Sequence, residues 1–151
     1  ELMKEDSIRL GLDAVDWEDA VRKSAEPLLE GGYIEPRYIE AMIDNIKVMG
    51  PYIVISPGLA MPHSLPKDGV IQTCMGLAVL RQPVRFGHKV NDPVRIVICM
   101  GATEGQEHMK SMSELVNLLS NDGATQSILH AQSRREVMGI IREYTKPRTH
   151  Q

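Results

Sequence analysis

The sequence feature that most constrains the fold is a nearly continuous apolar run, Val-Arg-Ile-Val-Ile-Cys-Met, over residues 94–100. A strand with one face in water alternates apolar and polar residues, whereas a continuous run is typical of a strand covered on both faces. Two more strands are predicted, over Tyr52–Ile55 and Val70–Leu80, with a short one near Val84–Phe86. These runs predict a central β-sheet whose two faces are both buried.

Helical patterns precede the predicted strands. Asp16 can cap a helix that runs to about Glu30. Pro36 suits the first turn of a second helix, which Gly50-Pro51 stops. The order of elements along the chain is therefore predicted to be helices, then strands, then helices again.

A second group of helices is predicted after the strands. A helical apolar stripe runs from Met109 to Leu119, and Asn121–His130 fits a short helix. Ser133–Glu136 is a capping box that opens a last helix. The sum is an α/β fold, a single domain over residues 1–151, with a mostly parallel or mixed sheet flanked by helices on both faces and a frayed tail from about residue 145.

The composition of the chain argues against several classes of function. The chain has 151 residues, a net charge of −3, no basic stripe and only 4% aromatic residues, which argues against a nucleic-acid partner. No apolar run could cross a bilayer and no signal-peptide core is present, so a cytoplasmic location is expected. The two cysteines lie in apolar runs, which fits a reducing compartment. Metal-ligand patterns, a Walker A motif and GxGxxG are absent from the sequence, so neither a metal nor a cofactor is expected.

One histidine lies in an unusually restricted loop. Ser56–Gly69 is predicted to be a loop after a strand, and within it Pro57, Gly58 and Pro62 constrain the backbone around His63. A neutral imidazole, with a free pKa of roughly 6.5, is a good nucleophile near neutral pH. The alternative is a loop histidine that only packs or hydrogen-bonds, and spacing alone favours that alternative.

Two further histidines are candidates. His108 follows the loop Gly101–Glu107 and lies in the first turn of the next predicted helix, where free N–H groups attract anions such as a phosphoryl group. His108 also shares a helical face with Met112 and Leu115, so it could equally be the partly buried end of that stripe. His88 lies in Phe86-Gly87-His88-Lys89, which reads as a surface turn.

The stretch Gly50–His63 resembles the phosphohistidine motif of the mannitol/fructose superfamily of enzyme IIA domains, part of the bacterial sugar phosphotransferase system. That motif reads Gly-(small or apolar)-Ala-(apolar)-Pro-His, and Gly58, Ala60, Pro62 and His63 match it. Within the superfamily, the segment Gly-Pro-Tyr-Ile-Val-Ile-Ser-Pro-Gly over residues 50–58 is similar to the ascorbate-specific branch. The resemblance extends over nearly the whole chain.

The resemblance implies a phosphocarrier. His63 would take a phosphoryl group from phosphorylated HPr and pass it to a cysteine of a cognate enzyme IIB, which acts with the membrane component IIC in uptake of L-ascorbate. The family's second histidine falls on His108, which would stabilise the phosphoryl group. Ser64, Gly58 and Pro62 would support the phosphoryl group or its loop. No metal is required.

Some points are left open by the resemblance. Mannitol-type members carry an Arg-Glu pair in the helix before the active loop, whereas the comparable stretch here, Ala41-Met42-Ile43-Asp44-Asn45, has no arginine. His88 and Phe86 are interface candidates. The alternatives to a transport phosphocarrier are a regulatory protein of the same fold, whose phosphorylation controls a partner, and a binding module whose His63 is structural.

Overall fold

The computed structural model describes residues 3–103 and 106–145, without the side chains of residues 106–109, 111 and 112. In this part of the chain one sheet has the strand order β1-β4-β5-β3-β2. The pairs β1·β4 and β3·β5 are parallel, and β4·β5 and β2·β3 are antiparallel, so the predicted α/β fold with a mixed sheet is confirmed. The strands are β1 (Met3–Leu12), β2 (Val54–Ser56), β3 (Leu59–Ala60), β4 (Cys74–Val84) and β5 (Val94–Gly101).

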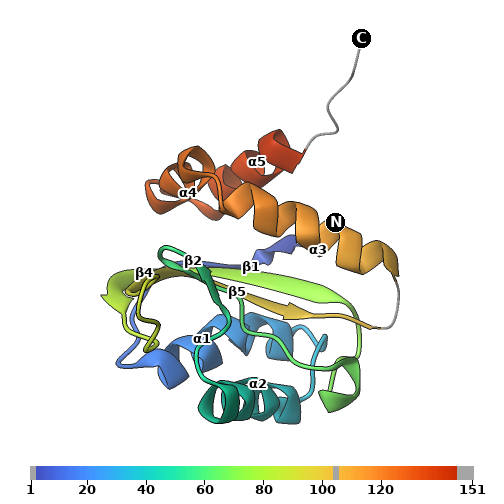
Figure 1. Ribbon diagram of the computed structural model, residues 1–151. Helices are drawn as coiled ribbons and strands as arrows, with labels where there is room; N and C mark the ends of the chain where they lie inside the picture. The colour runs from blue at the N-terminus through green and yellow to red at the C-terminus, as the bar shows by residue number, and fades with distance from the viewer. Residues whose placement is uncertain (1–2, 104–105, 146–151) are drawn as a thin grey trace.

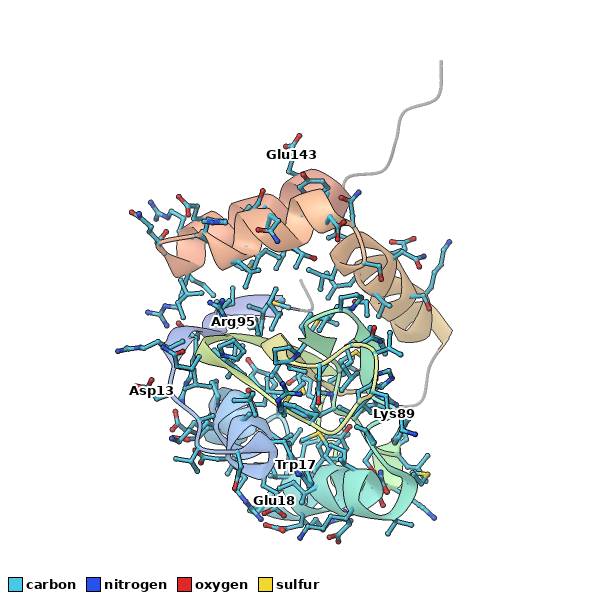
Figure 2. All side chains as sticks on the ribbon, turned by 60° about the vertical axis from the view of Figure 1, so that its left-hand side comes forward. Asp13, Trp17, Glu18, Lys89, Arg95 and Glu143 are labelled. Atoms are coloured by element: carbon cyan, nitrogen blue, oxygen red, sulfur yellow. The ribbon has the colours of Figure 1, made fainter. Side chains whose placement is uncertain are left out.

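Helices cover both faces of the sheet. Figure 1 shows the helices that follow β1 below the sheet and the helices that follow β5 above it. Figure 2 shows the same two layers from another side, with Trp17 on the lower layer and Glu143 on the outer side of the upper one. The lower helices are α1 (Trp17–Glu30) and α2 (Pro36–Met49), and the upper ones are α3 (Gln106–Leu119), α4 (Asp122–Leu129) and α5 (Arg134–Thr145).

The apolar run in β5 contributes to two hydrophobic cores. Val97 and Cys99 belong to the core under α1 and α2, whereas Ile96 and Ile98 belong to the core under α3, α4 and α5. All four side chains are fully buried. The expectation of a strand covered on both faces is therefore confirmed.

The prediction that the chain begins with helices is wrong, because β1 precedes α1. β1 is an edge strand that pairs in parallel with β4, with Ile8 opposite Leu77. Three successive charged residues, Lys4, Glu5 and Asp6, are exposed on this edge. They interrupt the apolar pattern that marks the inner strands, and charged edges of this kind also protect a sheet against pairing with other chains.

The strand boundaries also differ from expectation. The expected loop Ser56–Gly69 contains the two-residue strand β3 and a short 3-10 helix, η1 (Pro66–Asp68). β4 begins at Cys74 instead of Val70, because Val70 makes only an isolated bridge to Ile34. β4 then continues to Val84, so the separate strand expected near Val84–Phe86 is not formed: Val84 ends β4, and Phe86 lies beyond it.

The sheet brings the His63 loop beside the end of β5. β3 runs parallel to β5, with Leu59 opposite Ile96, so the carboxyl ends of the two strands lie at the same end of the sheet. After β3 the chain continues into Met61, Pro62 and His63. The backbone N–H of Met100 donates to the Pro62 carbonyl at 3.1 Å, which joins the loop to the end of β5.

Candidate phosphoryl-transfer site

The His63 side chain is exposed, and one of its ring nitrogens is already engaged. Nδ1 lies 2.8 Å from the backbone carbonyl oxygen of Met61. A carbonyl oxygen can only accept, so in the neutral ring Nδ1 must carry the proton and donate it. The lone pair therefore resides on Nε2, the nitrogen left free for nucleophilic attack.

The ring of His63 has an aromatic neighbour and a small cavity beside it. Tyr52 meets the imidazole edge-on, with 6.0 Å between ring centroids and an interplanar angle of 81°. A cavity of about 300 Å³ opens next to His63 between the end of β5 and helix α3. Its lining is mainly apolar and comprises Ile55, Met61, His63, Met100, Ser113, Val116 and Asn117.

The loop before His63 is tied to the sheet through its backbone. Met61 N–H donates to the Ile53 carbonyl at 2.8 Å. Gly58 N–H donates to the Asn91 carbonyl at 2.9 Å, and the Gly58 carbonyl accepts from Arg95 N–H, also at 2.9 Å. Gly58 has a φ of +77°, which L side chains rarely adopt, so the turn requires glycine here. These hydrogen bonds, together with the buried Pro62, hold the backbone before His63 in one conformation.

The residue after His63 is held by three side chains. Ser64 N–H donates to the Tyr38 hydroxyl at 2.9 Å, and Asn45 Nδ2 donates to Ser64 Oγ at 2.9 Å. The Ser64 hydroxyl donates in turn to the Asp68 carboxylate. Both donors of Ser64 are thus engaged away from His63, so this arrangement favours loop support over direct phosphoryl contact for Ser64.

Sequence reasoning missed Tyr38, Asn45 and Asp68. Tyr38 reads as one more buried residue of the α2 stripe, yet its hydroxyl donates to the Met100 carbonyl at 2.6 Å, and burial raises its pKa. The hydrogen bond from Ser64 lowers the pKa of Asp68 and keeps its carboxylate ionised. Asn45 closes the stretch that lacks an arginine, which was the available signal that this helix contacts the site.

The other residues predicted for the site are His108, His88 and Phe86, and the structure places each of them differently. The backbone of His108 lies in the first turn of α3, as expected, but its side chain lies outside the described part of the structure. His88 Nδ1 accepts from the backbone N–H groups of Val90 and Asn91, so its visible contacts lie within its own turn. Phe86 is only 4% exposed and packs 6.2 Å from the Trp17 ring, so it belongs to the core and the expectation of an interface role for Phe86 is wrong.

The described part of the structure contains neither a metal-binding cluster nor a membrane-spanning helix. Among the side chains that the structure describes, no group of three or more His, Cys, Asp or Glu residues is placed to hold a metal ion. In residues 3–103 and 106–145, none of the helices has the length and apolar character needed to cross a bilayer.

The fold thus places an exposed histidine, whose Nδ1 is held by a backbone carbonyl, just past the end of β3 and beside the end of β5 in a mixed sheet. The chain belongs to the family described as phosphoenolpyruvate-dependent sugar phosphotransferase system, EIIA 2, whose sequence model matches residues 1–144. Members of this family are phosphotransferases that carry a phosphoryl group.

The chain is also similar to individual members of this family. The chain is 37% identical over 141 residues to the ascorbate-specific PTS system EIIA component of Escherichia coli K12, covering 93% of this chain and 92% of that one. It superposes on a putative PTS IIA (PtxA) from Streptococcus mutans with a TM-score of 0.84 and 33% identity, over 93% and 89% of the two chains. It also superposes on one chain of the complex of enzyme IIAMtl and phosphorylated enzyme IIBMtl from E. coli, with a TM-score of 0.80 and 30% identity, over 94% of this chain and 99% of that one.

Proposed function

We propose that His63 accepts a phosphoryl group on Nε2 from phosphorylated HPr and passes it to a cysteine of a cognate enzyme IIB. The observation that carries this proposal is the hydrogen bond from Nδ1–H to the Met61 carbonyl, which leaves Nε2 as the nucleophilic nitrogen of an exposed ring. The similarity to a IIA that was solved with its phosphorylated IIB supports the second partner.

The hydrogen bond from Nδ1–H to the Met61 carbonyl is compatible with both steps, transfer of the phosphoryl group to His63 and its transfer from His63 to the cysteine. When Nε2 attacks phosphorus, the bond between phosphorus and the donor nitrogen breaks and the donor ring keeps that electron pair. The His63 ring then carries a phosphoryl group on Nε2, a proton on Nδ1 and a positive charge, which the Met61 carbonyl stabilises. In the second step the cysteine thiolate attacks phosphorus and the His63 ring leaves with its electron pair. The ring proton stays on Nδ1 throughout.

The phosphoryl group itself needs donors as its charge spreads over three oxygens in a loose transition state. We place His108 in this role, because it lies in the first turn of α3, the helix that follows β5, where free N–H groups favour an anion. Ser64, Gly58 and Pro62 support the loop. His88 remains an interface candidate at the turn that follows β4.

L-ascorbate is the substrate that this chain's IIB and IIC would phosphorylate and import. The support is the name shared by relatives at 37% identity over 93% of the chain. The phosphocarrier step would take place in the cytoplasm, where both protein partners can reach the same histidine in turn.

The first test is the intact mass of the protein after incubation with enzyme I, HPr and phosphoenolpyruvate. We expect one added phosphoryl group in the parent, none in His63→Gln, and slower addition in His108→Ala. His130→Gln is a matched control, because His130 is also exposed with Nδ1 held 2.8 Å from a carbonyl, that of Gln126, but it caps the C-terminus of α4. Labelling that survives in His63→Gln would refute the proposal.

A second stage separates transport from regulation. Purified IIB should remove the added mass, and membranes carrying IIC should then convert labelled ascorbate to its phosphate. If the parent is phosphorylated but ascorbate IIB leaves the mass unchanged, the regulatory alternative replaces the transport role.

A further inference from the structure

The His63 loop is anchored in different ways on its two sides. Before His63, backbone bonds to Ile53 and Met100 join Met61 and Pro62 to the sheet. After His63 the chain has left the strands and does not enter η1 until Pro66. The position of Ser64 therefore depends on side chains, and since Ser64 adjoins His63, so does the direction of the imidazole.

Ser64 is the meeting point of α2 and η1. From α2, Tyr38 accepts the Ser64 N–H and Asn45 donates to Ser64 Oγ. From η1, Asp68 accepts the Ser64 hydroxyl proton and also the Leu65 N–H at 3.2 Å. The Ser64 side chain thus bridges the two elements.

The proton directions in this network are determined by chemistry. The Asp68 carboxylate can only accept, so the single hydroxyl proton of Ser64 points to it. The remaining lone pairs of Oγ need a donor, and the Asn45 amide N–H provides one. With a group at position 45 that cannot donate, Oγ would lose its link to α2.

We propose that Asn45 is a positioning residue for phosphoryl transfer, which acts through the Ser64–Asp68 pair to hold His63 Nε2 in line with its partners. This inference rests on the proposed function of His63. Catalysis by positioning is sensitive to small displacements, since a shift of about 1 Å can cost on the order of a hundredfold in rate. Asn45 is the residue through which α2 holds the Ser64 hydroxyl. Because the Asn45 amide is neutral, it does this without adding a charge beside the phosphoryl group.

The test is single-turnover transfer from phosphorylated HPr, analysed as a maximal rate and a half-saturating HPr concentration. In Asn45→Ala we expect the maximal rate to fall about tenfold, with the half-saturating concentration nearly unchanged. Asn45→Asp has the same shape but cannot donate to Ser64 Oγ, so it should be slowed at least as much. The control is Asp44→Ala, an exposed neighbour on α2, which should behave like the parent.

A double mutant distinguishes action through Ser64 from a general loss of stability. In a Ser64→Ala background, Asn45→Ala should cause no further loss of rate, since residues that act through one contact are not additive. Additive losses would overturn the proposal. The melting temperature of each variant shows whether the fold is kept, and Asn45→Asp preserves the test if Asn45→Ala does not fold.

A second readout does not require phosphorylation. Nitrogen-15 NMR of the imidazole should show the Nδ1–H tautomer of His63 in the parent and a more mixed population in Asn45→Asp. If the parent is not phosphorylated at all, the proposed function fails, and the tautomer comparison still tests the positioning. If the parent transfers normally and both Asn45 variants match it in rate and tautomer, the positioning inference alone is wrong.

Discussion

At the scale of single residues, the hydrogen bond from Nδ1 to a carbonyl is necessary for the proposed chemistry but does not define the site. His130 makes the same kind of bond, to Gln126 at 2.8 Å, and is also exposed. What distinguishes His63 is its place beside an apolar cavity and its attachment on both sides to the sheet and to α2. The identity of a nucleophile therefore depends on its surroundings more than on its own tautomer.

The Tyr38 hydroxyl provides a residue-scale prediction on stability. It donates to the Met100 carbonyl and accepts from Ser64 N–H, and its residue is 1% exposed. Tyr38→Phe leaves both backbone groups without that partner, which should lower the free energy of unfolding by about 1–3 kcal/mol. Urea denaturation measures the change.

Tyr33→Phe is the matched control for this prediction. The Tyr33 hydroxyl accepts from Lys4 at an exposed site, so its loss should change stability by less than about 0.5 kcal/mol. Equal effects of the two substitutions would show that the Tyr38 contacts contribute nothing specific.

At the scale of elements, β5 is the best-predicted strand, β4 is found with shifted ends, and β1 and β3 were missed. The β5 run is predicted to within one residue, because both of its faces are apolar. β1 escaped prediction because its exposed charged residues dilute the pattern, and β3 because two residues carry no periodicity. The loop expected around His63 therefore contains a strand that only its pairing with β5 defines.

The missed strand β1 is nevertheless predicted to be important for stability. Ile8 is 1% exposed and packs into the core under α3, α4 and α5. Ile8→Ala should lower the free energy of unfolding by about 2–5 kcal/mol, through lost burial and the cavity left behind. Thermal or urea denaturation tests this.

Val15 offers an aliphatic control just outside the same strand. It is 88% exposed, so Val15→Ala should leave stability within about 0.5 kcal/mol of the parent. If Ile8→Ala lowered the free energy of unfolding as little as Val15→Ala, the burial of Ile8 in β1 would contribute little to stability.

At the scale of the whole molecule, the sheet separates two cores and shields both cysteines. Cys74 and Cys99 are 2% and 0% exposed and lie in the core under α1 and α2. Burial raises the pKa of the Cys74 thiol to about 11 and raises that of Cys99 as well. Thiolates react far faster than thiols, so the folded molecule should protect both residues.

We therefore expect the native protein at pH 8 to resist a thiol reagent, and the urea-unfolded protein to react at two thiols. Because the folded thiol pKa values lie above the unfolded value of roughly 8.5, the thiols favour folding below that pH, and this contribution is lost as pH rises toward 11. Fast labelling without denaturant would mean that this core opens locally.

The sequence by itself determined the doubly covered strand β5, the helices on either side of it, and a histidine in a loop restricted by proline and glycine. These features depend on periodicity and backbone preference, which are local along the chain. Only the tertiary structure decided that Tyr38 and Asn45, 26 and 19 positions from Ser64, would bond to it beside His63. Such polar contacts leave no periodic trace, because they depend on the path of the folded chain and on which donors and acceptors it brings within reach.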